Sequence, residues 1–276
     1  MPSLPPIRPE DEAAAARTRL HGVFDAPAEE PHETARVDLL LRLGDDALVL
    51  GQRLSEWCGH APALEVDLSL ANLALDLVGQ ATGLLNEAGG GNGDGLAFHR
   101  DVLDFRNCLL VEQPNGDFAR TIARHLLYST WQHLLLQRLT QSGDRFLAEH
   151  AAKSVKEIAY HRELATEWTV RLGDGTEESA TRMADGLDWC WRFVPELFEV
   201  DETLEALIGR GVVPDPREFE AEYRAAIGAV LADARLEVPK DQRPILGGRR
   251  GHHSEHLGHL LAIMQHLPRS YPDARW

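Results

Sequence analysis

The sequence predicts an all-α protein built on a four-helix bundle, and three observations support this. Apolar residues recur at steps of three and four along four long segments, which is typical of the buried side of a helix. The links within the first and second pairs of segments are short, whereas residues 89–116 separate the two pairs. No stretch alternates between apolar and polar residues as a half-buried strand does, so strands are not expected.

The first pair of segments predicts two long helices. One spans about residues 36–58 and ends before Gly59 and Pro62, which are residue types that stop helices. The other spans about 66–88 and ends at the glycine-rich stretch GGGNGDG. The first stripe consists of Leu40, Leu43, Ala47, Leu50, Leu54 and Trp57, and the second of Leu68, Ala71, Leu75, Val78, Thr82 and Leu85.

The second pair predicts two further long helices. One spans about 117–141, with Asp117 as its N-cap, because an aspartate side chain can accept a hydrogen bond from the first turn. The next spans about 144–172 and follows only the short link SGD. The stripe of this last helix consists of Ala151, Val155, Ile158, Ala165, Trp168 and Leu172.

Short, long and short connections give the bundle its expected topology. Two helical hairpins joined by one long crossover form a ferritin-like four-helix bundle. Additional C-terminal helices are expected at 176–198, 202–209, 216–233 and 252–267, packed around the bundle. We therefore expect one domain over 36–276, with a bundle core at 36–172 and packing helices at 176–267. Residues 1–35, rich in proline, alanine and acidic residues, are expected to form a flexible extension.

Composition excludes several functions. The 276 residues carry a net charge of −16, whereas a nucleic-acid-binding protein needs a basic surface. The amino terminus has no apolar stretch typical of a signal peptide, and we expect no membrane span. The three cysteines are widely spaced and form no metal-binding or disulfide pattern, which favours a cytoplasmic protein.

The stretch KEIAYHREL places Glu157 and His161 one turn apart, which raises the question of a metal site. A di-iron centre in such a bundle needs about four carboxylates and two histidines. The helix at 117–141 has no acidic residue after Asp117, and the helix at 66–88 has no histidine. We therefore expect neither a metal site nor catalytic residues in this chain.

Two interpretations of this stretch remain. The favoured one is a buried polar network that links Asp76, Gln80, Glu157 and His161 across facing helices, since buried polar groups are normally hydrogen-bonded. The alternative is an atypical metal site formed by Asp76, Glu157 and His161.

A second histidine-rich stretch, GHHSEHLGHLL, contains His252, Glu255 and His256 in the H-x-x-E-H pattern of some zinc peptidases. Such an enzyme needs a further downstream ligand, and only a short tail follows. A structural role is therefore favoured. Ser254 is expected to cap the last helix, and His253, Glu255 and His256 are expected to bind neighbouring backbone or form part of an interface.

Several long motifs resemble one family. They are LRLGDDALVLGQRLSEWCGHAPALEVDLSLANLALDLVGQATGLL, LLVEQPNGDFARTIAR, KEIAYH, RLGDGTEES and HHSEHLGHLLAIMQHLPRSYP. Together, and in this order, they closely resemble the C subunits of bacterial ring-1,2-phenylacetyl-CoA epoxidases, which are multicomponent monooxygenases. The resemblance runs from about residue 36 to the carboxyl terminus and leaves the first 35 residues outside.

The resemblance implies a ferritin-like structural subunit that carries no cofactor and is not itself catalytic. Its partners would be a homologous A subunit that holds a di-iron centre and binds phenylacetyl-CoA, and a small B subunit. A reductase with FAD and an iron–sulfur cluster would bring electrons from NADPH. The pathway would be aerobic phenylacetate breakdown in the cytoplasm, with neither nucleic acid nor membrane as a partner.

Two other functions stay open on the residues alone: a stand-alone ferritin-like oxidase and a helical scaffold for another partner. A structural subunit needs a large interface, and aromatic residues often anchor such interfaces. We expect an obligate interface of well over ~2,000 Å². Its anchors are expected among the tryptophans in predicted helices, which are Trp57, Trp131, Trp168, Trp189 and Trp191.

Overall fold

A computed structural model describes residues 31–274 of the chain. Most of the extension predicted at 1–35 lies outside these residues, and its last five residues belong to the first described helix. Over the described residues the protein consists of helices, turns and loops without a strand, which confirms the all-α prediction.

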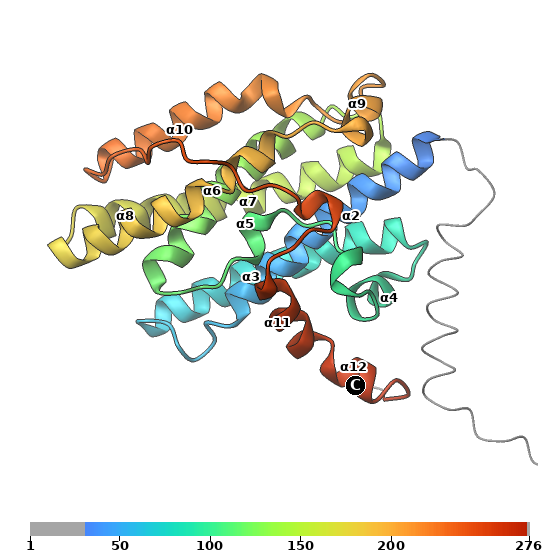
Figure 1. The fold of residues 1–276 in the computed structure, drawn as a ribbon, viewed down its shortest axis with the longest axis horizontal. Coiled ribbons are helices and arrows are strands. Elements are labelled where there is room, and N and C mark those ends of the chain that lie inside the picture. The colour runs from blue at the N-terminus through green and yellow to red at the C-terminus, as the bar shows by residue number, and fades with distance from the viewer. Residues whose placement is uncertain (1–30, 275–276) are drawn as a thin grey trace, which may run out of the picture.

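Four long helices form a ferritin-like bundle (Figure 1), as predicted. They are α2 (Pro31–Ser55), α3 (Leu64–Ala88), α6 (Phe118–Leu139) and α7 (Arg145–Gly173). Helices α2 and α3 form one closely packed hairpin and α6 and α7 the other. Both hairpins have short links, so the bundle follows the predicted connectivity.

The helix ends follow from local chemistry. The side chains of Asp117 and Asp144 accept hydrogen bonds from the backbone N–H groups of Arg120 and Leu147, so each caps its helix. Helix α2 starts at Pro31, five residues before the expected position, and proline is well suited to a first helical position because it lacks an N–H. The predicted boundaries of the four helices are otherwise within three residues of the observed ones.

The crossover between the hairpins contains three short helices: α4 (Gly93–Phe98), η1 (Val102–Asp104) and α5 (Leu109–Glu112). The remaining chain forms α8 (Glu177–Trp191), η2 (Val194–Phe198), α9 (Glu202–Ile208), η3 (Pro216–Phe219), α10 (Glu220–Asp233), η4 (Gly248–Arg250), α11 (Glu255–Met264) and α12 (His266–Ser270). Helices α8 and α10 pack against α6 and α7, whereas α11 and α12 extend away from the bundle (Figure 1).

The stripe predicted as the buried side of α3 is wrong except at Leu85, which is buried. Leu68 and Leu75 are 58% and 68% exposed. The buried side of α3 is formed by other positions, among them Leu70, Leu73, Ala74, Leu77, Ala81 and Leu84. The helix is apolar on two sides, so the three- and four-residue spacing of leucines exists on both, and spacing alone could not select the side that packs against α2.

The prediction that tryptophans anchor an interface is wrong for two of the five and stays a prediction for Trp57, Trp168 and Trp189, which are half-buried. Trp131 and Trp191 are each only 4% exposed and belong to the core of this chain. Trp57 and Trp168 pack edge-on against Phe118, with ring centroids 5.8 and 5.0 Å apart, and Trp189 packs against the same core. All five tryptophans therefore contribute to the packing of this chain, and two of them are withdrawn from its surface.

Candidate functional site

Polar side chains from three helices meet inside the bundle. Gln80 of α3 donates a hydrogen bond from Nε2 to Glu157 Oε2 of α7 at 2.9 Å. Gln132 of α6 donates from Nε2 to Gln80 Oε1 at 3.1 Å. Both glutamines are buried, whereas Glu157 is half-buried. These amide and carboxylate groups link the three helices.

His161 and Asp76 form a second pair between α7 and α3. The distance between His161 Nε2 and Asp76 Oδ2 is 3.3 Å. His161 is fully buried, but the Asp76 side chain is 38% exposed. The four residues predicted as one network thus lie in two pairs along the contact between α3 and α7. Asp76 and Glu157 both keep access to solvent.

Sequence reasoning missed His125, which lies further inside the bundle than Asp76 and Glu157 and is buried. Its ring centroid is 5.2 Å from that of His161, and its helix also brings Ser129 and Gln132 to the centre. Burial lowers the pKa of His161 to about 3 and lowers the pKa of His125 well below its usual value, so both rings are neutral. The signal in the sequence is the spacing of His125, Ser129 and Gln132 by four and three residues, which contains no carboxylate and so does not match a metal-ligand pattern.

These residues do not fit a di-iron centre. Two irons in a buried place need about four carboxylates to balance their charge. Helix α6 supplies a neutral histidine, a hydroxyl and an amide, and Glu157 is hydrogen-bonded to Gln80. In residues 31–274, no three histidine, cysteine or acidic side chains are grouped so that they could hold a metal ion. Asp76, Glu157 and His161, the alternative metal site, are likewise not grouped in this way.

We predict that Glu157→Ala lowers stability without affecting chemistry. The change removes the acceptor of the buried Gln80 amide, and an unsatisfied buried donor costs about 1–3 kcal/mol. Thermal melting followed by circular dichroism measures the loss. Glu163→Ala, an exposed change on the same helix, is the matched control and should melt like the wild type. An unchanged melting temperature with abolished turnover of the assembled complex would contradict the structural role.

A cluster of buried ion pairs joins α2 to distant segments. Asp46 of α2 is completely buried and contacts Arg249 Nη2 through Oδ2 at 2.8 Å. It also accepts hydrogen bonds from the Cys108 backbone N–H at 2.7 Å and the Tyr128 hydroxyl at 3.2 Å. The adjacent Asp45 pairs with Arg100 of the crossover. Both acidic residues therefore fix the crossover or the C-terminal segment onto α2.

Glu196 fixes the same two segments to each other. Its carboxylate accepts hydrogen bonds from the backbone N–H groups of Leu109, Gly247 and Gly248 at 2.6, 2.8 and 2.7 Å. Burial raises the pKa of Glu196, although Arg249 and the three N–H groups oppose this effect. Gly248 lies so close to the crossover that a Cβ atom would collide with the backbone oxygen of Asn107.

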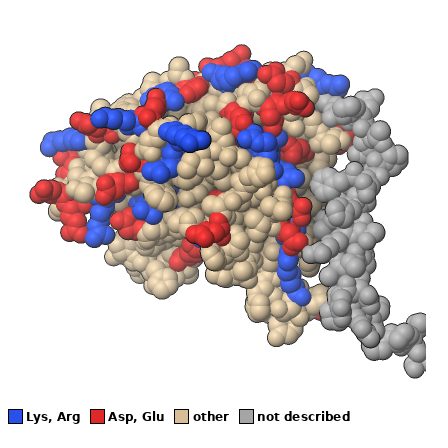
Figure 2. Space-filling model, in the orientation of Figure 1, with Lys and Arg blue, Asp and Glu red and all other residues tan. Residues whose placement is uncertain are grey.

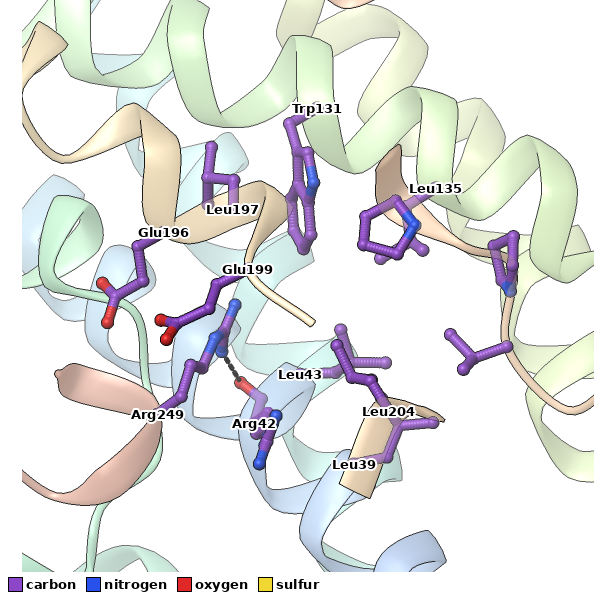
Figure 3. Close-up of a pocket in the computed structure, with 13 residues that line it drawn as sticks. Leu39, Arg42, Leu43, Trp131, Leu135, Glu196, Leu197, Glu199, Leu204 and Arg249 are labelled. Atoms are coloured by element: carbon purple, nitrogen blue, oxygen red, sulfur yellow. Dashed lines mark hydrogen bonds between the residues drawn. The ribbon is translucent and has the colours of Figure 1, made fainter. Parts of the chain in front are cut away.

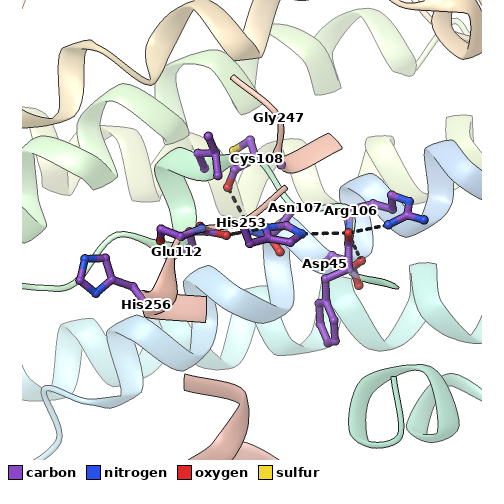
Figure 4. Close-up of polar contacts among 12 residues, drawn as sticks. Asp45, Arg106, Asn107, Cys108, Glu112, Gly247, His253 and His256 are labelled. Carbon is purple, nitrogen blue, oxygen red and sulfur yellow. Dashed lines mark hydrogen bonds and ion pairs between the residues drawn. The ribbon is translucent and has the colours of Figure 1, made fainter. Parts of the chain in front are cut away.

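The histidine-rich stretch contributes a buried ion pair (Figure 4). His253 Nδ1 lies 2.7 Å from Glu112 Oε2, and both side chains are fully buried. His253 Nε2 lies 3.0 Å from the Phe105 backbone oxygen. With Glu112 ionised, both neighbouring oxygens accept, so both ring nitrogens donate and the ring is an imidazolium. Burial alone would lower the pKa of His253, but the hydrogen bond and charge of Glu112 outweigh it and raise the pKa.

His253 is not one of the three residues of the H-x-x-E-H pattern, and those three do not converge, since His252 is exposed. Glu255 is exposed at the start of α11, and His256 lies to one side of the His253–Glu112 pair (Figure 4). Ser254 occupies the N-cap position of α11 as predicted, but its hydroxyl makes no capping bond. Its backbone N–H instead donates to Glu112 Oε1 at 2.6 Å.

A pocket between α2, α6, η2 and α9 is too small for an organic ligand (Figure 3). It encloses ≈ 40 Å³, whereas pockets for small organic ligands enclose about 300–1,000 Å³. The pocket has Trp131 and Leu135 on one side and Arg42 and Arg249 on another. Arg42 pairs with Asp201 and Arg249 with Asp46. The pocket therefore has neither the volume nor a free charge for a CoA thioester.

Fold and site together define a ferritin-like helical bundle whose centre holds neutral histidines and amides in place of a di-metal ligand set. The chain belongs to the phenylacetic acid catabolic protein family, whose sequence model matches residues 24–276. It is 49% identical over 240 residues to the C subunit of the 1,2-phenylacetyl-CoA epoxidase of Escherichia coli (strain K12). That alignment covers 86% of this chain and 97% of the relative. The resemblance noted in the sequence is confirmed, and the family match begins at residue 24 rather than 36.

Proposed function

We propose that this chain is the structural, non-catalytic subunit of a multicomponent monooxygenase that epoxidises the ring of phenylacetyl-CoA. It would act in aerobic phenylacetate breakdown in the cytoplasm and pair with a homologous subunit that holds the di-iron centre. The observation that carries the proposal is the bundle centre, which is occupied by the uncharged side chains of His125, Gln132 and Gln80. Close similarity to the C subunit of an epoxidase with this substrate in its name supports the same function.

The chemistry of the centre supports a division of labour. A di-iron centre of the ferritin-like type needs about four carboxylate ligands, and amides and neutral histidines supply no negative charge. The hydrogen bonds among Gln132, Gln80 and Glu157 instead stabilise the packing of three helices. The oxidation would therefore take place in the A subunit, and the B subunit would join the assembly. Electrons from NADPH would arrive through the FAD and iron–sulfur cluster of the reductase.

Reconstitution with subunits omitted one at a time tests this function. The chain with reductase, NADPH and oxygen is expected to form no epoxide from phenylacetyl-CoA, as read by mass spectrometry of the products. Addition of the A and B subunits is expected to give the epoxide. The A and B subunits without this chain are expected to be insoluble or poorly active. Full-rate epoxidation without this chain, or epoxidation by this chain alone, would refute the proposal.

Metal content distinguishes the structural subunit from the rival function. The rival is a stand-alone oxidase with iron at Asp76, Glu157 and His161. Glu157 is hydrogen-bonded to Gln80, whereas His161 faces Asp76, so the three side chains form two pairs. Elemental analysis of protein made in iron-rich medium is expected to show well under one iron per chain. About two irons per chain with a di-iron spectrum would favour the oxidase.

A further inference from the structure

Five buried polar atoms at the bundle centre have no hydrogen-bond partner within residues 31–274. They are both ring nitrogens of His125, Nδ1 of His161, Oγ of Ser129 and Oε1 of Gln132. We call these four residues the central cluster, and each of them is at most 7% exposed. Buried polar groups are normally hydrogen-bonded, and an unsatisfied one costs free energy. Such a group of atoms indicates a ligand that bonds to them.

The atoms of the central cluster belong to one site. His125, Ser129 and Gln132 are spaced by four and three residues, so they lie on one side of α6. The His161 ring of α7 lies beside them, with its centroid 5.2 Å from that of His125. Neither nitrogen of His125 bonds to the other ring. One bridging water with two hydrogen bonds of about 2.8 Å spans ~5 Å, which is comparable to this separation.

Neighbouring groups fix the hydrogen-bonding roles of two of these atoms. Nε2 of His161 faces the acceptor Asp76 Oδ2, so Nε2 carries the hydrogen and Nδ1 is an acceptor. The Glu157 carboxylate accepts from Gln80 Nε2, which leaves Gln80 Oε1 to accept from Gln132 Nε2. The remaining polar atom of Gln132, Oε1, is therefore also an acceptor.

The other atoms of the central cluster both donate and accept. His125 is neutral, so one of its nitrogens donates and the other accepts, and the Ser129 hydroxyl can do both. The cluster thus presents at least three acceptors and two donors. A metal ion bonds only to lone pairs, and an anion only accepts hydrogen bonds. A small neutral molecule that both donates and accepts can satisfy the whole set, and water is the smallest of this class.

The surroundings also favour a neutral ligand. In the view of Figure 2, charged side chains lie on the outside of the molecule, where they crowd over α8, α9 and α10. The two carboxylates that border the central cluster, Asp76 and Glu157, are already bonded to His161 and Gln80. Because Asp76 is 38% exposed, solvent reaches the outer end of the site.

We infer that the central cluster binds at least two water molecules, which link α6 to α7 and exchange with solvent beside Asp76. Three acceptors need three donated hydrogens, and one water supplies two, so a single molecule is not enough. Buried waters typically make about three hydrogen bonds each, so two of them can satisfy all five atoms. The core of a ferritin-like bundle is where metal sites are built, and in this chain the same place holds water as a structural ligand.

A high-resolution crystal structure of the full chain, with anomalous data at the iron and zinc edges, tests the inference. Two or more density peaks without anomalous signal are expected at about 2.6–3.2 Å from the atoms of the central cluster. An anomalous peak bonded to the two rings would make the ligand a metal ion and overturn the inference. Side chains that bond to one another with no peak between them would overturn it as well.

The variant Ser129→Val provides a second test, in solution. Valine lacks the hydroxyl and is larger than serine, so it fills part of the space beside the two rings. Magnetic relaxation dispersion of the water oxygen nucleus counts long-lived internal waters and is expected to show the loss of at least one. The control Ser270→Val changes an exposed serine and is expected to keep the wild-type count. Equal counts for the wild type and Ser129→Val would contradict the inference, and the wild-type crystal structure decides the question if Ser129→Val does not fold.

Discussion

Replacement of Arg249 by alanine is expected to lower the free energy of unfolding by about 3–5 kcal/mol, because it strands a buried charge. Arg249 provides the only side-chain cation that contacts Asp46 among the ion pairs of residues 31–274. Asp46 is fully buried, and burial already raises its pKa while Arg249 opposes the rise. For a chain of this size the loss corresponds to a fall in Tm of roughly 6–20 °C.

A neighbouring arginine provides the control. Arg250 pairs with Glu199 at 2.6 Å, but their side chains are 46% and 25% exposed. Arg250→Ala is therefore expected to cost less than about 1 kcal/mol. The second variant Asp46→Asn, added to Arg249→Ala, removes the stranded charge and should restore part of the stability. Equal losses for Arg249→Ala and Arg250→Ala in urea unfolding would refute the account of Asp46.

The loss of unfolding free energy caused by Arg249→Ala should also depend on pH. Without Arg249, the pKa of the folded-state Asp46 rises further above its unfolded value, so the folded protein binds the proton more tightly. Stability of the variant relative to the wild type should then improve as pH falls through that raised value. A deficit that stays constant with pH would show that lost packing, rather than charge, causes the destabilisation.

Replacement of His253 by glutamine is expected to cost about 2–3 kcal/mol at pH 6 and less at alkaline pH. The pKa of His253 is raised in the folded state, so its contribution to stability is fully present below the unfolded value of about 6.5. The contribution is lost as pH rises through the raised folded value. The wild type therefore approaches the variant at high pH, and urea unfolding at several pH values measures the difference.

The adjacent histidine serves as the control. His252 is exposed, and His252→Gln should leave the free energy of unfolding at pH 6 unchanged. Glu112 keeps hydrogen bonds from the Asn107 side chain and the Ser254 backbone in the His253 variant, which limits its loss. If the difference in unfolding free energy between the wild type and His253→Gln grows with pH, His253 is neutral in the folded protein.

The helices were predictable because the residues that start, end and bury each helix lie within or next to that helix in the sequence. The caps at Asp117 and Asp144 and the spacing of leucines along α2 depend only on neighbouring residues, so they can be identified from the sequence. The bundle topology followed from loop lengths alone. The α3 helix shows the limit, since a helix with two apolar sides gives the same periodicity for either one.

The polar contacts were less predictable because they join distant parts of the chain. His253 and Glu112 are 141 residues apart, and nothing in either local stretch identifies the other. The H-x-x-E-H spacing drew attention to Glu255 and His256, whereas the buried partner came from the crossover. At the bundle centre, a search for metal-binding carboxylates finds acidic residues such as Glu157. It does not find the uncharged side chains beside them.

The contacts of the C-terminal segment have a consequence for synthesis on the ribosome. Asp46 is made early, but its partner Arg249 follows 203 residues later. A nascent chain emerges at about 5–20 residues per second, so Asp46 spends at least several seconds without its partner. Glu196, once made, must likewise wait for the backbone N–H groups of Gly247 and Gly248, which follow 51 and 52 residues later. A chain that terminates early retains unpaired buried acids, so only a nearly complete chain becomes fully stable.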